Sequence, residues 1–359
     1  PDTTLVMQEM PEPRATHVFK RGDFLSPGEK VEPGVPAALH PFPEGAPRNR
    51  LGLARWLTDR RNPLTARVTV NRWWAEFFGR GLVETPEDFG TQGAPPTHPG
   101  LLDWLAVEFM DCGWSRKHVH RLIVTSATYR QSSRASPELW KRDPANALLA
   151  RGPRFRLPAE AVRDNALAVA GLLSRKMGGP PVKPPQPPGV WNVTGMVDNT
   201  YRVSAGEDRY RRGLYTIWRR SAPYPSFVAF DAPDRSSCVV QRPRTNTPLQ
   251  ALALMNGEVY VEAARAFARR VLAECGGGER EQVAWAFRAC LARPPTSEEV
   301  HILAEVYGRE LARFRTDPGA ARALIGPGEC PDGVEAARLA ALFHVTTILL
   351  NLDETITKG

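Results

Sequence analysis

The chain has 359 residues, of which 42% are hydrophobic and 24% are charged, a composition typical of a globular protein with a sizeable core. It has no run of about 18 apolar residues, so we expect no membrane span. Its 5 cysteines lie far apart without a C-x-x-C pair, which excludes the common zinc ribbons and a c-type haem attachment site within this sequence.

The positive charge is concentrated in the middle of the chain. Residues 151–247 carry 16 basic and 7 acidic side chains, a balance of +9, whereas the balance is +2 for residues 1–150 and −3 for residues 248–359. Most of the basic residues are arginines, which suit bidentate capture of carboxylate, sulfate or phosphate. The middle of the chain is therefore the first place to look for a polyanion-binding surface.

The first half of the sequence predicts an extended segment followed by helices. Residues 1–47 are rich in proline and glycine, and only residues 16–20 have the pattern of a strand. Residues 48–177 change to helical periodicity, with cap and stop signals at Asn62, Gly79 and Ser115. The expected helices cover residues 51–59, 62–78, 99–113, 115–127 and 158–178.

The second half begins with a break in this pattern. Residues 178–247 contain proline runs and many aromatic residues, and the alternation over 213–218 predicts a strand with 238–241 as its partner. Residues 248–359 return to helical periodicity, starting at the capping box Thr247-Pro-Leu-Gln250. The predicted fold is α+β, mainly α-helical, with a small antiparallel sheet in the central aromatic segment. Continuous motifs favour one integrated unit over residues 16–359.

The densest polar cluster surrounds two aspartates, Asp231 and Asp234, which are separated by Ala-Pro. Three readings stay open. The carboxylates could face each other across the turn as the acid and base of a glycan hydrolase. The cluster could bind an anion or a glycan. The aspartates could instead cap a loop that arginine ion pairs tie to the helices, which is the favoured reading. The other members of the cluster are Arg235, Arg242, Arg244 and Asn246.

Four further candidates come from the first helical half. Asn71 and Arg72 interrupt an apolar helix, so they either point at a pocket or anchor a neighbouring loop, and loop anchoring is favoured. Asp88 begins a D-F-G sequence, but the chain lacks the glycine-rich phosphate loop of kinases, so the match is attributed to chance. His98 precedes a helix-opening proline and is favoured as a cap or loop anchor over a catalytic base.

Basic and aromatic residues alternate around Arg212, in Tyr-Arg-Arg at 210–212 and Trp-Arg-Arg at 218–220. Both nucleic-acid and anionic-glycan sites use such pairs. Base stacking needs exposed rings, whereas the pattern here turns most rings inward, so nucleic acid is the weakest partner. His118 and His120 would lie on different faces of a helix, so they cannot share a metal ion, and no metal site is expected.

Several motifs together resemble the domain of unknown function 1553, the "PSD" domain typical of planctomycete proteins. They include N-P-L-T-A-R-V at 62–68, S-A-T-Y-R-Q at 126–131, F-D-A-P-D-R at 230–235 and R-T-N-T-P-L-Q-A-L at 244–252. The resemblance extends from about residue 16 to the last residue. It implies the C-terminal region of a large exported protein, periplasmic or at the cell surface, that often carries a cytochrome-c-like domain. The haem would then lie upstream, with no cofactor in this chain.

The resemblance transfers no catalytic residues, so it leaves the function open. The favoured hypothesis is an interaction module that binds a glycan, another polyanion or a partner domain, including the upstream domains of the same polypeptide. The alternative is a hydrolase or redox-associated enzyme with its site around residues 231–246, using Asp231, Asp234 and His98. The geometry of the site distinguishes the two hypotheses, because an enzyme needs these groups to converge in a pocket that water can enter.

Overall fold

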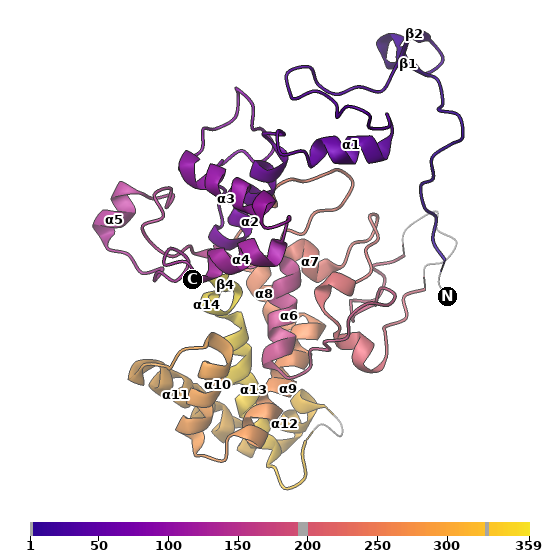
Figure 1. Cartoon of the computed structure of the whole chain (residues 1–359). Helices are drawn as coiled ribbons and strands as arrows, with labels where there is room; N and C mark the ends of the chain where they lie inside the picture. Colours follow the sequence, from indigo (N-terminus) through magenta and orange to yellow (C-terminus); the bar gives the residue numbers. More distant parts are fainter. Residues whose placement is uncertain (1–2, 193–199, 327–329) are drawn as a thin grey trace. The chain divides into compact units, whose positions relative to one another are not determined.

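The computed structural model describes residues 3–192, 200–326 and 330–359 (Figure 1). The chain divides into two compact units, Pro1–Gly152 and Pro153–Gly359, and each is described here by itself. The boundary falls inside the stretch 48–177 that the sequence assigned to one helical half. That residues 16–359 act as one integrated unit stays a prediction. The division describes which residues contact one another, and it does not tell whether the two units unfold together.

The first unit begins with a two-stranded antiparallel hairpin. Strand β1 (Thr16–Phe19) pairs with β2 (Pro27–Val31), and the short 3-10 helix η1 (Lys20–Gly22) follows β1 directly. The strand predicted near residues 16–20 is therefore confirmed. Its partner β2 was not predicted, because Pro27 and Gly28 disfavour strand structure when they are judged locally.

The core of the first unit is built from helices α2, α3 and α4. They cover Thr65–Phe78, Pro99–Asp111 and Arg116–Thr125, and α1 (Arg50–Leu57) and α5 (Pro137–Arg142) complete the set. The predicted helix ends are confirmed at Gly79, which has a φ of 79°, and at Ser115, whose side chain caps α4. Buried side chains shared by the three core helices include Val70, Trp74, Leu105, Phe109, Val119 and Ile123.

The second unit is a helical bundle around α13 (Ala336–Asn351). This helix packs against α9 (Glu258–Glu274) and α11 (Ser297–Thr316), and most of its apolar residues are buried, with Ile348 exposed. The other helices are α6 (Ala159–Val169), α7 (Pro225–Ala229), α8 (Pro248–Asn256), α10 (Glu279–Leu291), α12 (Pro318–Ile325) and α14 (Asp353–Ile356). In the described part of the chain no helix is both long and apolar enough to cross a membrane.

A second small antiparallel sheet joins the two ends of this unit. Strand β3 (Phe155–Arg156) pairs with β4 (Thr357–Lys358), so the start of the unit is hydrogen-bonded to its last residues. The mainly helical class with small antiparallel sheets is confirmed. Both sheets, however, lie outside the central aromatic segment where the sequence placed one.

The predicted strand at 213–218 is wrong. Residues Gly213–Tyr215 form a short 3-10 helix, η3, and another, η2, covers Gly206–Tyr210. The N–H group of Gly213 donates to Oδ1 of Asp164 at 2.6 Å, and a Cβ at Gly213 would lie 3.0 Å from the backbone of Glu160. The segment therefore packs along α6, and among the described residues its strand-like pairing is limited to an isolated parallel bridge between Thr216 and Val182. The proposed partner at 238–241 is exposed.

Helix α6 also ends earlier than predicted, at Val169 instead of residue 178. Gly171 has a φ of 77°, which ends the helix, and Ser174 then forms a parallel bridge with Arg211. The apolar residues Leu172 and Leu173 pack on the core from outside the helix. Apolar spacing alone extended the predicted helix too far.

Candidate functional site

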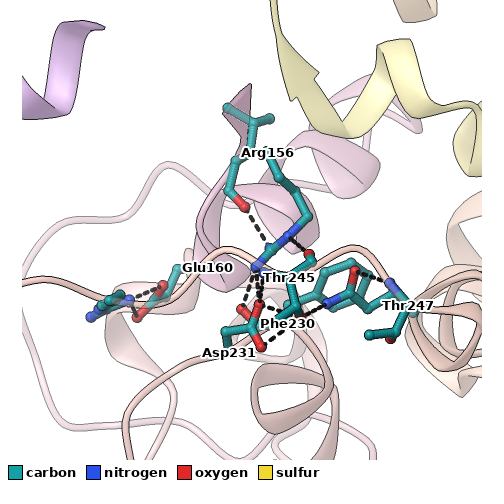
Figure 2. A network of polar contacts seen from close by, with 9 residues as sticks. Arg156, Glu160, Phe230, Asp231, Thr245 and Thr247 are labelled. Carbon is teal, nitrogen blue, oxygen red and sulfur yellow. Dashed lines mark hydrogen bonds and ion pairs between the residues drawn. The ribbon is translucent and has the colours of Figure 1, made fainter. Parts of the chain in front are cut away.

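The side chain of Asp231 joins the two ends of a surface loop formed by residues 232–244. One carboxylate oxygen accepts the backbone N–H of Thr245 at 2.8 Å, and both oxygens lie 2.9 Å from the Thr245 hydroxyl (Figure 2). Compact loops of this length with ends held together are frequently functional. We call this segment the 232–244 loop.

Arg156, from strand β3, binds both ends of the loop, and its side chain is only 7% exposed. Its Nη2 donates to the Asp231 carboxylate at 2.5 Å and to the carbonyl of Phe230 at 3.2 Å, and its Nε donates to the carbonyl of Thr245 at 2.9 Å. Burial raises the pKa of Asp231, but the hydrogen bonds from Thr245 and Arg156 outweigh it, so the pKa lies below its usual value. The carboxylate is thus held in its charged form.

Helix α8 attaches to the same closure through Gln250, which is buried. Its amide nitrogen donates to the Thr245 hydroxyl at 3.1 Å, and its amide oxygen accepts the N–H of Thr247 at 3.3 Å. This is the capping box predicted from the sequence. Asn246, between the two threonines, is exposed. The base of the loop is therefore continuous with a regular helix.

The three arginines of the loop lie against the rest of the unit. Arg235 stacks over the ring of Trp218 at 4.5 Å, and Arg244 stacks over Phe155 at 4.3 Å. Nη1 of Arg242 donates to both carboxylate oxygens of Glu160, at 2.9 and 3.0 Å. These guanidinium groups hold the loop to its scaffold, so they do not form a free basic strip.

The backbone of the loop is held in an uncommon conformation near its start. Asp231 and Arg235 have φ values of 62° and 65°, in the left-handed region that costs a non-glycine residue free energy. Between them, Asp234 accepts the N–H of Ser236 on Oδ1 at 2.8 Å, and its carbonyl accepts the indole N–H of Trp218 at 3.1 Å. Such conformations persist only where the surroundings enforce them, and they cluster at functional sites.

Asp231 and Asp234 therefore serve different partners. Asp231 closes the loop, whereas Asp234 caps the turn after Pro233. Each carboxylate is engaged by its own hydrogen-bond donors, Arg156 and Thr245 for Asp231 and Ser236 for Asp234. The reading that these aspartates cap a loop tied down by arginines describes the observed geometry, although the tie to Asp231 comes from Arg156 and not from Arg235, Arg242 or Arg244.

The tip of the loop, residues 236–241, points its side chains to solvent. Val239 and Val240 are 45% and 46% exposed, and Cys238 is an exposed free thiol. Among the residues that the structure describes, no backbone N–H of residues 237–243 donates to another backbone group. The tip thus displays, on a closed and anchored loop, apolar side chains and backbone N–H groups that have no backbone acceptor among the described residues.

Much of the basic excess of residues 151–247 lies inside the protein. Arg151, Arg156, Arg163 and Arg211 are buried. Arg163 donates to the carbonyls of Arg211 and Arg209 at 2.7 and 3.1 Å. These donors satisfy backbone oxygens of irregular, proline-rich segments that have no regular secondary structure to pair with. The local charge balance therefore overstates the exposed positive charge.

Arg211 and Arg212, adjacent in sequence, have different roles. The buried Arg211 donates to the carbonyls of Lys176, Gly178 and Pro180 and lies over the ring of Tyr215. The candidate Arg212 is exposed, and its Nε lies 3.6 Å from the Asp164 carboxylate. Burial raises the pKa of Asp164 above its usual value, against the hydrogen bond from Gly213 and the nearby arginines.

The remaining candidates belong to the first unit, and three of them, Asn71, Asp88 and His98, make local hydrogen bonds. The buried Asn71 side chain donates to the carbonyl of Val83 at 3.0 Å and accepts its N–H at 2.8 Å, whereas Arg72 is exposed. Asp88 accepts the N–H of Gly90 at 2.7 Å, and His98 pairs with the hydroxyl of Thr97 at 3.0 Å. Asn71 thus anchors a loop. Within the described residues, no group of three or more His, Cys, Asp or Glu side chains is placed to hold a metal ion.

Sequence reasoning missed Arg156, the residue on which the closure depends. Arg156 and Asp231 are 75 positions apart, so no local motif connects them. A weak signal was present, because Arg156 stands between Phe155 and Leu157 just before a helix-opening proline, a position that favours burial. Glu160 and Trp218 were missed as partners of Arg242 and Arg235 because they too are distant in the sequence from the arginines that they contact.

Comparison with known proteins agrees with the motifs. The family model PSD1, described as a protein of unknown function (DUF1553), matches residues 49–307, which confirms the resemblance inferred from the sequence. No curated protein matches the chain, and neither does any solved structure.

Proposed function

We propose that the chain, which belongs to the DUF1553 family, is a non-enzymatic protein-interaction module whose recognition element is the 232–244 loop. The observation that carries the proposal is the closure of this loop by Asp231 and Thr245, with the apolar tip facing solvent. A loop that is already ordered loses little entropy when it binds, so anchoring at its base favours affinity. The proposed contact residues are Val239 and Val240, which supply apolar area, with the neighbouring backbone groups supplying hydrogen bonds.

A protein partner fits this loop better than a polyanion or a glycan does. The arginines of the loop are engaged by Trp218, Phe155 and Glu160, so a polyanion would have to compete with existing contacts. One face of each of the two rings is covered by a guanidinium group, which leaves that face unavailable to a sugar ring. The exposed tip is uncharged from Ser236 to Gln241.

The partner that we propose is another domain of the same exported polypeptide, in keeping with the family resemblance. An enzyme site around residues 231–246 is not part of the proposal. Asp231 is held by Arg156 and Thr245, and Asp234 by the turn that it caps, so neither carboxylate is free to move a proton to or from a substrate.

The exposed thiol of Cys238 allows a direct test. A maleimide-linked benzophenone attached to Cys238 places a photocrosslinker at the loop tip. The control carries the same probe at an exposed position on α11 of the same unit, in the double variant Cys238→Ser/Ala312→Cys. After illumination with the neighbouring domains of the natural polypeptide, we expect one discrete crosslinked product from Cys238 only, competed by unlabelled chain. Equal products from both positions, or none from Cys238, would contradict the proposal.

A second measurement addresses the polyanion alternative. We expect the chain to pass through a heparin column at about 50 mM salt, or to be retained equally at about 50 and 200 mM, because the loop offers no free cluster of charge. Retention that weakens with salt and disappears in the variant Arg235→Gln/Arg242→Gln would assign the loop to a polyanion instead.

A further inference from the structure

A cavity of about 930 Å³ lies among the ends of α11 and α12 and the start of α13, and it shares no residue with the 232–244 loop. Its lining is mostly apolar and includes Phe314, Ile325, Cys330, Val334, Ala336 and Ala337. Its polar members are Arg315, Arg322 and Glu335. Cavities that take small organic ligands have this size and this mixture of apolar walls with a few polar groups.

The local sequence explains why space is left here. Helix α11 ends at Thr316, and Asp317 then caps α12 by accepting the N–H of Ala320 at 2.9 Å, so the chain turns back within two residues. The side chains that face this turn from α12 and α13 include the alanines Ala323, Ala336 and Ala337. Alanines beside Phe314 and Ile325 do not fill the volume that larger apolar residues would occupy.

The charged residues of the lining differ in whether they have a partner of opposite charge. Arg315 makes a bidentate pair with Glu335 at 2.9 and 3.0 Å, and this hydrogen bonding lowers the pKa of Glu335. Arg322 is exposed in the last turn of α12, and within the described residues no carboxylate lies within 4.0 Å of it. Among the described residues, the lining therefore has one guanidinium group without a carboxylate partner, that of Arg322, beside an apolar space.

We infer that this cavity binds an alkyl chain that ends in a carboxylate, as in a free fatty acid of medium length. The chain occupies the space beside Phe314, Ile325 and Ala336, where it leaves water. The carboxylate pairs with Arg322, whose planar fork matches its two oxygens. The committed pair of Arg315 and Glu335 contributes no net charge.

The test uses the whole chain and two soluble probes of equal length, dodecanoate and dodecyltrimethylammonium, both below their micelle concentrations. Calorimetry is expected to give saturable binding of one dodecanoate per chain, and binding of the cationic probe at least about tenfold weaker. Arg322→Gln should weaken dodecanoate binding about tenfold, whereas Arg280→Gln, an exposed arginine on α10 outside the lining, should leave it unchanged.

Filling the cavity gives an independent readout. Ala336→Phe should abolish dodecanoate binding. If circular dichroism shows that this variant does not fold, Ala323→Phe, at an exposed alanine of the lining, replaces it in the test. Equal binding of the two probes, or dodecanoate binding that survives both the filled cavity and Arg322→Gln, would overturn the inference. So would sedimentation with phosphatidylglycerol vesicles in the absence of dodecanoate binding, which would indicate a membrane surface instead.

Discussion

The Asp231 carboxylate accepts both the backbone N–H and the hydroxyl of Thr245, 14 residues further along the chain, at 2.8 and 2.9 Å. Arg156 donates to both of these residues, so a charged side chain from the start of the second unit holds the base of the 232–244 loop. The exposed tip depends on buried polar groups for its shape. The proposed recognition by the tip and the stability of the unit therefore both depend on Asp231.

Removing the Asp231 carboxylate should be costly. In Asp231→Ala the nearly buried Arg156 loses the one carboxylate partner that it has among the described residues. This loss costs about 3 kcal/mol of unfolding free energy, the low end for breaking a buried ion pair because the backbone acceptors remain. Urea unfolding measures the change. Asp234→Ala is the matched control, since Asp234 only caps an exposed turn, and it should cost about 1 kcal/mol or less. A similar loss of unfolding free energy in both variants would show that Asp231 does not close the loop.

Two neighbouring residues in α2 offer a sharper comparison. Asn71→Ala removes two buried hydrogen bonds to Val83 and leaves its N–H and carbonyl unpaired, so it should destabilise the first unit by about 2–4 kcal/mol. Arg72→Ala, one position later, is exposed and should stay within about 0.5 kcal/mol. Thermal or urea unfolding compares the two. A larger loss of unfolding free energy in Arg72→Ala than in Asn71→Ala would mean that Arg72, and not Asn71, has the structural role.

The pairing of Arg293 with Glu299 and Glu354 predicts a dependence on acid. Hydrogen bonding to Arg293 lowers the pKa of Glu299 from 4.5 to about 2. A lowered folded-state pKa contributes stability that is complete above the unfolded value and is lost as the pH falls through the folded value. Glu299→Gln should therefore be less stable than the parent chain at pH 7, with a difference that shrinks between pH 4.5 and about 2. A difference that is constant over this range would contradict the assigned pKa.

The cysteines should differ strongly in reactivity. Cys238 is exposed at the loop tip, whereas burial raises the pKa of Cys290 to about 11 and its thiol contacts the hydroxyl of Thr355 at 3.3 Å. Because the thiolate is the reactive form, iodoacetamide at pH 8 should modify Cys238 well before Cys290. Peptide mass spectrometry after timed alkylation measures both rates. Modification of Cys290 at the rate of Cys238 would place Cys290 at the surface.

Features set by neighbouring residues were the ones that the sequence predicted well. The caps at Ser115 and Thr247 and the glycine stop at Gly79 depend on a few consecutive residues, and the structure has all three. The strand at 213–218 failed because the backbone of Gly213 is bound by Asp164, which lies 49 positions away. The end of α6 was misjudged because Leu172 and Leu173 continue the apolar spacing after the helix has ended.

In the candidate site, too, residues that are close in the sequence could be predicted, whereas contacts between distant residues could not. Asp231, Asp234, Arg235, Arg242 and Arg244 could be chosen from the sequence because they are clustered there. Their partners Arg156, Glu160 and Trp218 come from elsewhere in the chain, and only the folded structure shows that the arginines are occupied. The charge balance therefore suggested an exposed basic strip where the structure has a tied loop.

The affinity of the partner captured through Cys238 tests the central claim most directly. Val239→Asp/Val240→Asp places charges at the proposed contact, and Val228→Asp places one at a similarly exposed valine of α7 outside the loop. If the 232–244 loop is the recognition element, the double variant should weaken binding by at least about tenfold, while Val228→Asp leaves it within about twofold. Unchanged binding by the double variant, or equal weakening by both, would contradict the account.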